Sequence, residues 1–307
     1  MLALVITQRP ATEPDDLRSA ESVLTGAWLD GSPFVASHPG DLEWWYASVT
    51  PRALDEHLRL WSTRDGVRAW SWVHGHLVHW EIRPTDPTTD GQVLDAILRA
   101  AIAEIPGRVE VWAPEDDAAT LATLDRLGFR ARTLRLSQFQ RRVDDGAPIA
   151  DAVLPAGYRL RHLEGPDEIP VRAAIHRAAF PSSTVTAEQY ARLTTLPTYR
   201  FEDDLVVEAP DRSLAAFAMA WWDPVARVGE FEPVGTHPDH QRLGLARTLL
   251  GHGLRRYRER GARLVQVYAL SDNSPAEALY PAAGFVRRRH RLHFERPAAG
   301  DAGSDGP

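Results

Sequence analysis

The order of predicted elements along residues 157–296 restricts the fold more than any other feature of the sequence. Period-two or apolar runs predict strands there, and apolar residues at helical spacing predict helices. The order is β-α-α-β-β-β-α-β-α-β, which is typical of an α/β protein with a mixed sheet covered by helices. The predicted strands are 158–163, 203–209, 213–223, 226–236, 262–270 and 286–296, and the predicted helices are 166–180, 186–196, 245–261 and 274–285.

Residues 1–143 repeat this order less clearly. The predicted strands are 2–7, 57–63, 67–75, 76–84, 108–114 and 130–143, and the predicted helices are 13–29, 38–49, 90–105 and 117–129. LDRLGF ends the last helix of this half where LYPAAGF ends that of the second. We therefore predict a tandem duplication, with residues 1–143 and 157–296 as two related domains. Residues 144–156 are predicted to be a linker and 297–307 a disordered tail.

Composition excludes several kinds of chemistry and partner. The formal net charge of −7 argues against nucleic acid or an anionic membrane as the partner. The absence of cysteine excludes disulfides and thiolate chemistry, and all 35 basic Lys+Arg residues are arginine, which excludes lysine Schiff bases. No secretory signal precedes the first domain and no run reaches the roughly 18 apolar residues of a membrane span, so we expect a cytoplasmic protein.

The segment THPDHQRLGLA, residues 236–246, carries the clearest chemical signal. It lies between a predicted strand and a predicted helix. Gly244 removes a side chain where the backbone turns, and Ala246 keeps the first helical turn small. Free N–H groups and the helix dipole would attract an anion there, and Gln241 and Arg242 would add donors. The segment suits a pyrophosphate; a loop that merely contains a glycine is the alternative.

This segment and a second motif resemble the GNAT (Gcn5-related) N-acetyltransferase superfamily. The family's loop is Gln/Arg-x-x-Gly-x-Gly/Ala after a strand and a proline, and Asn-x-x-Ala-x-x-Leu-Tyr-x-x-x-Gly-Phe follows it. The loop is matched by Gln241, Gly244 and Ala246, with Val234, Thr236 and Pro238 before it, and the second motif by Asn273, Ala276, Leu279, Tyr280, Gly284 and Phe285. The resemblance rests on motifs over residues 157–296 and only on element order over 1–143. The tandem plan is similar to that of mycothiol synthase.

The resemblance implies an enzyme that transfers the acetyl group of acetyl-CoA, its co-substrate, to an amine of a small molecule or peptide by direct attack on the thioester. It implies that the backbone of residues 234–236 pairs with the pantetheine arm, that Asn273 holds this arm, and that Tyr280 gives a proton to the departing thiolate. The implied cofactor-binding residues are Val234, Gly235, Thr236, Gln241, Arg242, Leu243, Gly244, Leu245, Ala246, Arg247 and Asn273. No metal is expected, because no His/Asp/Glu spacing supports one, His237 and His240 included.

Two glutamates are the candidate bases for the amine. Glu230 and Glu232 would share a face of their strand, and their proximity would raise one pKa toward the range of a useful base. In some members of the family that the chain resembles, a glutamate base lies on this strand, and counting back from Gln241 favours Glu230. Pro233 is expected to introduce a bulge that disturbs this count. Contact with arginines or solvent is the alternative role for either glutamate.

The first half lacks the loop. Gly91 stands alone there, Asp86 and Asp90 would repel phosphates, and Asp125 stands where the tyrosine would be. We therefore predict that residues 1–143 do not bind acetyl-CoA in the usual way. Eight of the ten tryptophans lie in this half, and core or interdomain packing is favoured for them over a binding pocket.

Two other functions stay open on sequence alone. The chain would be an acyl-CoA-binding regulatory or scaffold protein without turnover, or a transferase that uses another acyl-CoA. The acceptor and the oligomeric state cannot be read from these residues.

Overall fold

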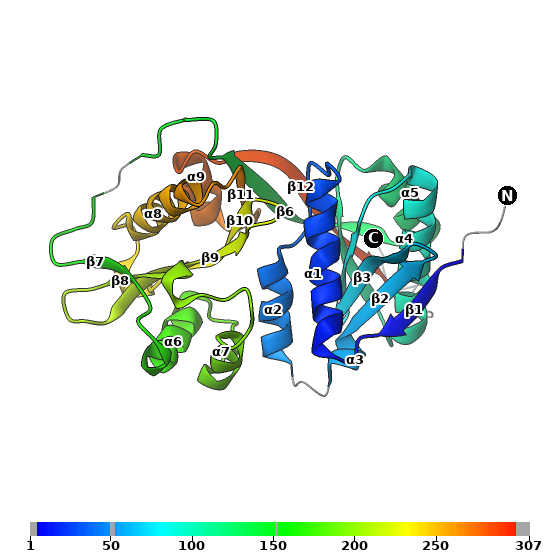
Figure 1. Cartoon of the computed structure of the whole chain (residues 1–307), viewed down its shortest axis with the longest axis horizontal. Coiled ribbons are helices and arrows are strands. Elements are labelled where there is room, and N and C mark those ends of the chain that lie inside the picture. Colours follow the sequence, from blue (N-terminus) through cyan, green and yellow to red (C-terminus); the bar gives the residue numbers. More distant parts are fainter. Residues whose placement is uncertain (1–4, 50–52, 151–152, 299–307) are drawn as a thin grey trace, which may run out of the picture.

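The computed structural model describes residues 5–49, 53–150 and 153–298. The strands of these residues form one twelve-stranded mixed sheet with helices on both faces (Figure 1), so the predicted α/β class is confirmed. The first half contributes β1 (Thr7–Pro10), α1 (Pro14–Leu29), α2 (Pro39–Ser48), α3 (Leu54–His57), β2 (Leu58–Thr63), β3 (Gly66–His74), β4 (Leu77–Ile82), α4 (Pro87–Glu104), β5 (Val109–Pro114), α5 (Ala118–Arg126) and β6 (Arg130–Arg142).

The second half has the predicted order of elements. It contains β7 (Arg159–His162), α6 (Ile169–Ala179), α7 (Ala187–Leu193), β8 (Asp204–Glu208), β9 (Leu214–Asp223), β10 (Val228–Thr236), α8 (Leu245–Glu259), β11 (Leu264–Leu270), α9 (Ser274–Ala282) and β12 (Val286–Arg296).

Three details of the first half and the termini differ from the predictions or fall beyond them. The strand predicted over 2–7 is wrong at residues 5 and 6, because β1 begins only at Thr7, and residues 2–4 lie outside the described residues. The short helix α3 was not predicted. Most of the predicted tail, residues 299–307, lies outside the described residues.

The last strands of the two halves are exchanged. The sheet order is β1-β2-β3-β4-β5-β12-β6-β11-β10-β9-β8-β7. The second half's β12 pairs with β5 of the first half, from Arg291 opposite Pro114 to Arg296 opposite Val109. The first half's β6 lies between β12 and β11. Each half therefore completes the sheet of the other, an arrangement that the alternation pattern of a single strand does not specify.

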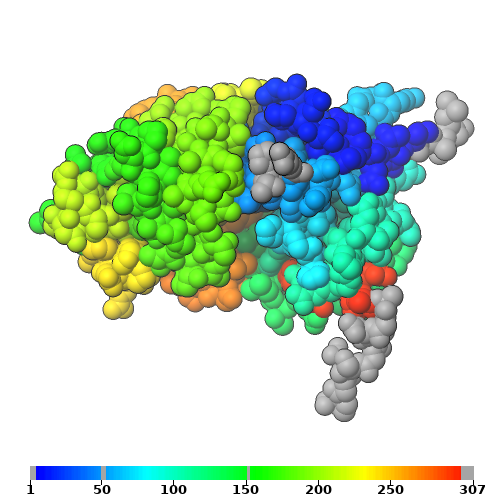
Figure 2. Space-filling view, turned by 90° about the horizontal axis from the view of Figure 1, so that it is seen from below, coloured from blue at the N-terminus to red at the C-terminus, as the bar shows by residue number. Residues whose placement is uncertain are grey.

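Alternate residues of β9 face two different layers. Ala216, Ala218 and Ala220 pack in the cluster that contains Leu249 and Tyr257 of α8. Phe217, Met219 and Trp221 pack in the cluster that contains residues of α6 and α7 and Ala47 of α2. A helix of the first half thus covers a strand of the second, and Figure 1 shows α2 between α7 and α1. The two halves also meet in the space-filling view (Figure 2).

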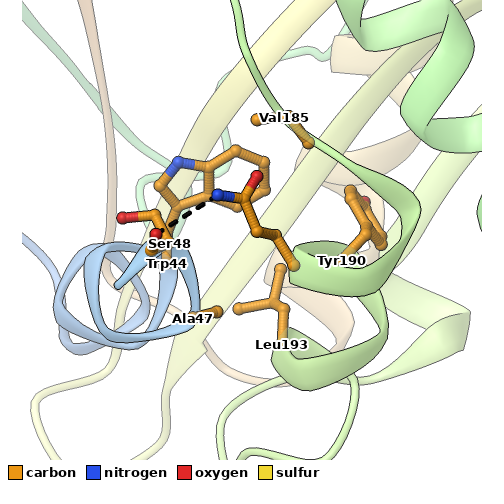
Figure 3. A pocket seen from close by; sticks show the side chains of 7 residues that line it. Trp44, Ala47, Ser48, Val185, Tyr190 and Leu193 are labelled. Carbon is orange, nitrogen blue, oxygen red and sulfur yellow. Dashed lines mark hydrogen bonds between the residues drawn. The ribbon is translucent and has the colours of Figure 1, made fainter. Parts of the chain in front are cut away.

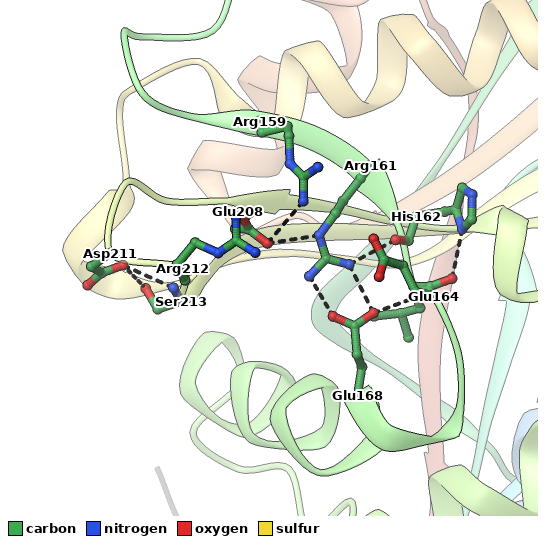
Figure 4. A network of polar contacts seen from close by, with 10 residues as sticks. Arg159, Arg161, His162, Glu164, Glu168, Glu208, Asp211, Arg212 and Ser213 are labelled. Carbon is green, nitrogen blue, oxygen red and sulfur yellow. Dashed lines mark hydrogen bonds and ion pairs between the residues drawn. The ribbon is translucent and has the colours of Figure 1, made fainter.

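Ion pairs fix the outer edge of the sheet to α6. Arg161 on β7 donates to Glu208 on β8 at 3.0 Å and to Glu168, just before α6, at 2.5 Å (Figure 4). Deeper in, the buried Arg172 on α6 pairs with the buried Asp204 on β8 at 2.9 Å. These contacts set the position of α6 and α7 over the sheet.

Candidate active site

The strands β10 and β11 separate halfway along their length. They pair in parallel only over Val228–Glu230, opposite Leu264–Gln266. Beyond this point β11 continues beside β6, whereas the register of β10 with β9 shifts between Phe231 and Val234. The bulge expected at Pro233 is therefore confirmed, and proline suits it because it has no N–H to donate. Residues 231–236 are left without a β11 partner, so this edge of β10 is open to an extended ligand.

The loop after β10 presents an exposed helix N-terminus beside this opening. A 3-10 turn at Pro238–His240 leads to Gly244, whose φ of 76° is left-handed, and α8 begins at Leu245. Residues 241–244 are exposed. A β-carbon built on Gly244 would meet no atom within 4 Å, so conformation and ligand space, not packing, call for glycine here. The first N–H groups of α8 have no intrahelical acceptor and are suited to an anion.

The equivalent helix of the first half differs in this respect. Asp86 is the N-cap of α4, and its carboxylate accepts from Thr88 N and Thr89 N, both at 3.0 Å. Asp90 accepts from Thr85 N at 3.2 Å. The chain's own carboxylates thus occupy the N–H groups that are free in α8, and phosphate would meet their charge.

The helix α9 places Asn273 and Tyr280 near the opening. Asn273 is the N-cap, and its side-chain oxygen accepts from Ala276 N at 3.2 Å. Tyr280 is 5% exposed, and its ring packs against Phe139 of β6 and Phe285. Burial raises the pKa of Tyr280 above its ordinary value, and the charge of Glu232 adds to this. The phenol therefore stays protonated and can act as a donor.

Glu230 and Glu232 lie in different surroundings. Glu230 is fully buried, and its Oε2 accepts from Gln266 Nε2 at 2.5 Å. Solvent reaches the side chain of Glu232, although protein atoms surround it on most sides, and its carbonyl accepts from Trp221 Nε1 at 2.7 Å. Partial desolvation by the surrounding protein, with the charge of Asp41, raises the pKa of Glu232 to about 8. Burial also raises the pKa of Glu230 well above its ordinary range, and Asp41 and Glu232 add to this.

Asp41 comes from the first half. It is the third residue of α2, and its Oδ2 accepts from the backbone N of the N-cap His38 at 2.8 Å. A β-carbon on Gly40 would lie 2.2 Å from the Trp221 ring, so glycine lets α2 approach β9 closely. Asp41 and Glu230 lie within electrostatic reach of each other, and burial raises the pKa of Asp41 to about 6.

Further polar and apolar groups line the contact between α2 and the second half. The buried Glu43 accepts from Thr198 N at 2.9 Å, and burial raises the pKa of Glu43 to about 7. Trp44, Ala47 and Ser48 of α2 face Val185 and residues of α7 across a small apolar hollow (Figure 3). Gln189 Nε2 closes it by donating to Ser48 O at 3.2 Å.

Comparison with known proteins identifies the family. Residues 173–285 match the Acetyltransferase (GNAT) family. Mycothiol acetyltransferase of Frankia alni is 30% identical over 229 residues, which are 69% of this chain and 67% of that protein. Mycothiol acetyltransferase of Actinosynnema mirum is 33% identical over 211 residues, 66% of this chain and 69% of that protein. The chain belongs to the GNAT family of N-acetyltransferases.

Solved GNAT structures show the same fold over almost the whole chain. A tandem GNAT protein from the clavulanic acid biosynthesis pathway matches with a TM-score of 0.64 and 14% identity, covering 97% of this chain and 100% of that one. A GNAT protein from Sphaerobacter thermophilus matches with a TM-score of 0.62 and 16% identity, covering 95% and 96%. The tandem form predicted from element order is thus confirmed. The segment aligned with the Frankia casuarinae mycothiol acetyltransferase spans 65% of that relative's length.

In this GNAT chain the predicted site residues come from three neighbouring segments: the open edge of β10, the loop into α8, and α9. Of the loop histidines, His240 is bound to the Tyr158 hydroxyl at 2.9 Å. Within the described ranges, no group of three or more His, Asp or Glu side chains is arranged to hold a metal ion. Nor does any helix in that part of the chain combine the length and apolar character needed to cross a bilayer.

Sequence reasoning missed Asp41. HPGD, with proline first and aspartate third in the helix, is a helix-start signal, and it predicts α2 correctly. Nothing local indicates that the same aspartate meets Glu230, which is 189 positions further along the chain.

Proposed function

We propose that this chain transfers the acetyl group of acetyl-CoA to an amine, at a single site in its second half. The observation that carries the proposal is the opening between β10 and β11, which lies beside an exposed helix N-terminus. Glu232 of β10 and the phenol of Tyr280 lie within electrostatic reach of each other there. GNAT membership supports acetyl transfer in general, and the residues of this site support the particular roles that follow.

The binding roles follow from the open backbone groups. The edge of β10 from Val234 to Thr236 would pair with the pantetheine arm as an added strand. The loop from Gln241 to Arg247 would hold the pyrophosphate, with Leu243, Gly244, Leu245 and Ala246 presenting backbone N–H groups and Arg242 adding charge. Asn273 would bind the arm through the amide hydrogens that its capping contact leaves free.

The catalytic roles follow from protonation. The amine nitrogen forms a bond to the thioester carbonyl carbon and loses one proton, and the carbon–sulfur bond breaks. We assign the acceptance of that proton to Glu232, because solvent reaches its side chain. Tyr280 lies within electrostatic reach of Glu232 and gives a proton to the departing sulfur. The residues of the first half do not repeat this site, since Asp86 fills the start of α4.

We propose that the acceptor is a small-molecule or peptide amine that enters at the α2–α7 side of the sheet. Glu21 of α1 lines a hollow on this side together with Tyr46 of α2 and Arg192 of α7, and its carboxyl group is a candidate partner for the amine. The acceptor of the mycothiol acetyltransferases is the first candidate to try, because these relatives cover both halves of the fold in part.

Calorimetric titration with acetyl-CoA, followed by an assay of CoA release with a panel of amines, tests this function. We expect one binding site and turnover with at least one amine. Two sites would show that the first half also binds acetyl-CoA. Binding without turnover across the panel would favour a regulatory acyl-CoA-binding protein, and no binding would refute the proposal.

A further inference from the structure

We propose that Asp41 and Glu230 hold one proton between them, so that Glu230 stays neutral, Asp41 carries the charge, and Glu232 alone takes the proton of the amine. Asp41 is then a positioning residue that the first half supplies to the site of the second. The part that concerns Glu232 rests on the proposed function; the shared proton does not.

Within the part of the chain that the structure describes, the hydrogen bonds of Glu230 leave one of its side-chain oxygens without a partner, and a proton on the pair would supply one. Its Oε2 accepts from Gln266, whereas its Oε1 is buried and has no donor among the described residues. Asp41, another carboxyl, lies beside Glu230, because the preceding Gly40 packs on the ring of Trp221, which is the β9 partner of Glu230. Two ionised carboxylates in contact repel each other and can only accept, so a single proton between them satisfies both.

The fold holds Asp41 in place against this repulsion. His38 N donates to Asp41 Oδ2, and the ring nitrogen Nδ1 of His38 accepts from Gly40 N at 3.1 Å. Gly40 packs directly on Trp221, whose Nε1 donates to the carbonyl of Glu232. The start of α2 is thus packed against the strands that carry Glu230 and Glu232, and these contacts hold the backbone of Asp41 beside Glu230.

The groups around the pair do not neutralise it. Those that act on Glu230 are Asp41 from α2 and Glu232 from its own strand, with Gln266 of β11 as donor. Tyr268 of β11 and Tyr257 of α8 lie within electrostatic reach of Glu230, and burial keeps both phenols protonated. Burial lowers the pKa of His38 to about 4, so this imidazole is neutral near pH 7.

The order of titration agrees with the geometry. Burial raises the pKa of Asp41 to about 6 and that of Glu230 well above its ordinary range, which places the proton of the pair on Glu230 at neutral pH. Asp41 then carries a charge that raises the pKa of Glu232. Glu230, fully buried, is sealed from an incoming amine, although its distance from Gln241 in the sequence favours it as the base.

Glu230→Gln is the decisive variant, because glutamine has the shape and bonding of a protonated glutamate. Its carbonyl would accept from Gln266 and its NH2 would donate to Asp41. For Glu230→Gln we expect the Kd of acetyl-CoA and kcat to stay within a few-fold of the parent, with the same midpoint of the pH profile. For Glu232→Gln we expect a loss of about 10²–10⁴-fold in kcat. If Glu230→Gln loses as much as Glu232→Gln, Glu230 is the base and the proposal is wrong.

The double variant Asp41→Asn/Glu230→Gln isolates the charge of Asp41. The introduced asparagine would still accept from His38 N, so the start of α2 keeps its cap. Because the charge that raises the pKa of Glu232 is gone, the rise of kcat/KM with pH should move to lower pH than in Glu230→Gln. An unmoved profile would show that Asp41 is only structural.

The pH dependence of the unfolding free energy tests the shared proton even if the enzyme shows no activity. The pKa of Glu230 is raised on folding, so its contribution to stability is complete below its unfolded pKa and is lost as pH rises. Urea unfolding between pH 5 and 7 should therefore show Glu230→Gln taking up about one proton fewer on folding than the parent. Equal pH slopes for the two proteins would overturn the shared proton, whatever the activity.

Discussion

At the scale of single residues, the site combines the carboxyl group of Glu232 with the phenol of Tyr280, and the protein gives them different roles by raising both pKa values. Glu232 lies on the bulge of β10, and Tyr280 lies on α9 behind the opening. Raised pKa values affect them in opposite ways. The carboxyl group becomes a stronger base than a free glutamate, whereas the phenol becomes a more secure carrier of its proton.

The pH dependence of the reaction should follow Glu232. A base works only when ionised, so kcat/KM should rise with pH through about 8 and then level off. Tyr280 should cause no fall below pH 10, because its pKa is raised above the ordinary value. Measuring kcat/KM against pH with amines of different basicity separates the titration of Glu232 from that of the substrate amine. If the midpoint of the rise changes with the pKa of each amine, the assignment to Glu232 is wrong.

Tyr280→Phe should reduce kcat by about 10²-fold or more while acetyl-CoA binding is unchanged. The ring packs against Phe139 and Phe285, and phenylalanine keeps those contacts. The hydroxyl forms no hydrogen bond with other residues of the described ranges, so its loss should leave thermal stability nearly unaltered. Steady-state kinetics and a thermal melt check this; an unchanged kcat would remove Tyr280 from the proton transfer.

At the scale of elements, the loop before α8 depends on the left-handed conformation of Gly244. Gly244→Glu should abolish acetyl-CoA binding in calorimetry, because it adds a carboxylate at the free helix N-terminus and strains a φ of 76°. Gly75→Glu is a matched control, since Gly75 also has a positive φ, 61°, and open space around it, in the β3–β4 turn. If both variants lose binding equally, strain and not the phosphate site is responsible.

The position of α6 depends on the buried pair of Arg172 and Asp204. Both side chains are fully buried, the Arg172 guanidinium lies 3.9 Å from the Phe217 ring centre, and the hydroxyl of Tyr199 donates to Asp204 at 3.2 Å. Asp204→Asn leaves the arginine charge buried and uncompensated, which should cost about 3–5 kcal/mol of unfolding free energy. Urea unfolding measures this. Arg172→Met/Asp204→Leu, which removes both charges, should cost less; an equal cost would show that packing dominates.

Elements and motifs were predictable from the sequence, whereas contacts between distant segments were not. Gly244 and Pro233 act through the local backbone, so residue type alone indicated a turn at the first and a bulge at the second. The sequence did not indicate that Asp41 belongs to the site, because its role depends on tertiary packing, although its helix was predicted. The choice between Glu230 and Glu232 likewise depends on which side chain solvent reaches, and alternation within one strand does not determine this.

At the scale of the whole molecule, the exchange of β6 and β12 makes the two halves a single folding unit. β6 of the first half lies between β11 and β12, and Phe139 of β6 packs on Tyr280. The second half alone would therefore lack a central strand as well as Asp41. In the first half, Asp86 and Asp90 occupy the position where a phosphate would bind. This half is nevertheless needed to build the site of the second half.

Cutting the chain between the halves should leave the molecule intact. A protease site placed at the exposed Asp145–Gly146 bond would follow β6 and leave every strand pair in place. The two fragments should co-elute in gel filtration, keep acetyl-CoA binding and separate only in urea. Residues 157–307 expressed alone should be insoluble or fail to bind, because β11 and β12 then expose unpaired edges. Fragments that separate without denaturant, or a second half that binds acetyl-CoA by itself, would show that the exchanged strands do not join the halves into one unit.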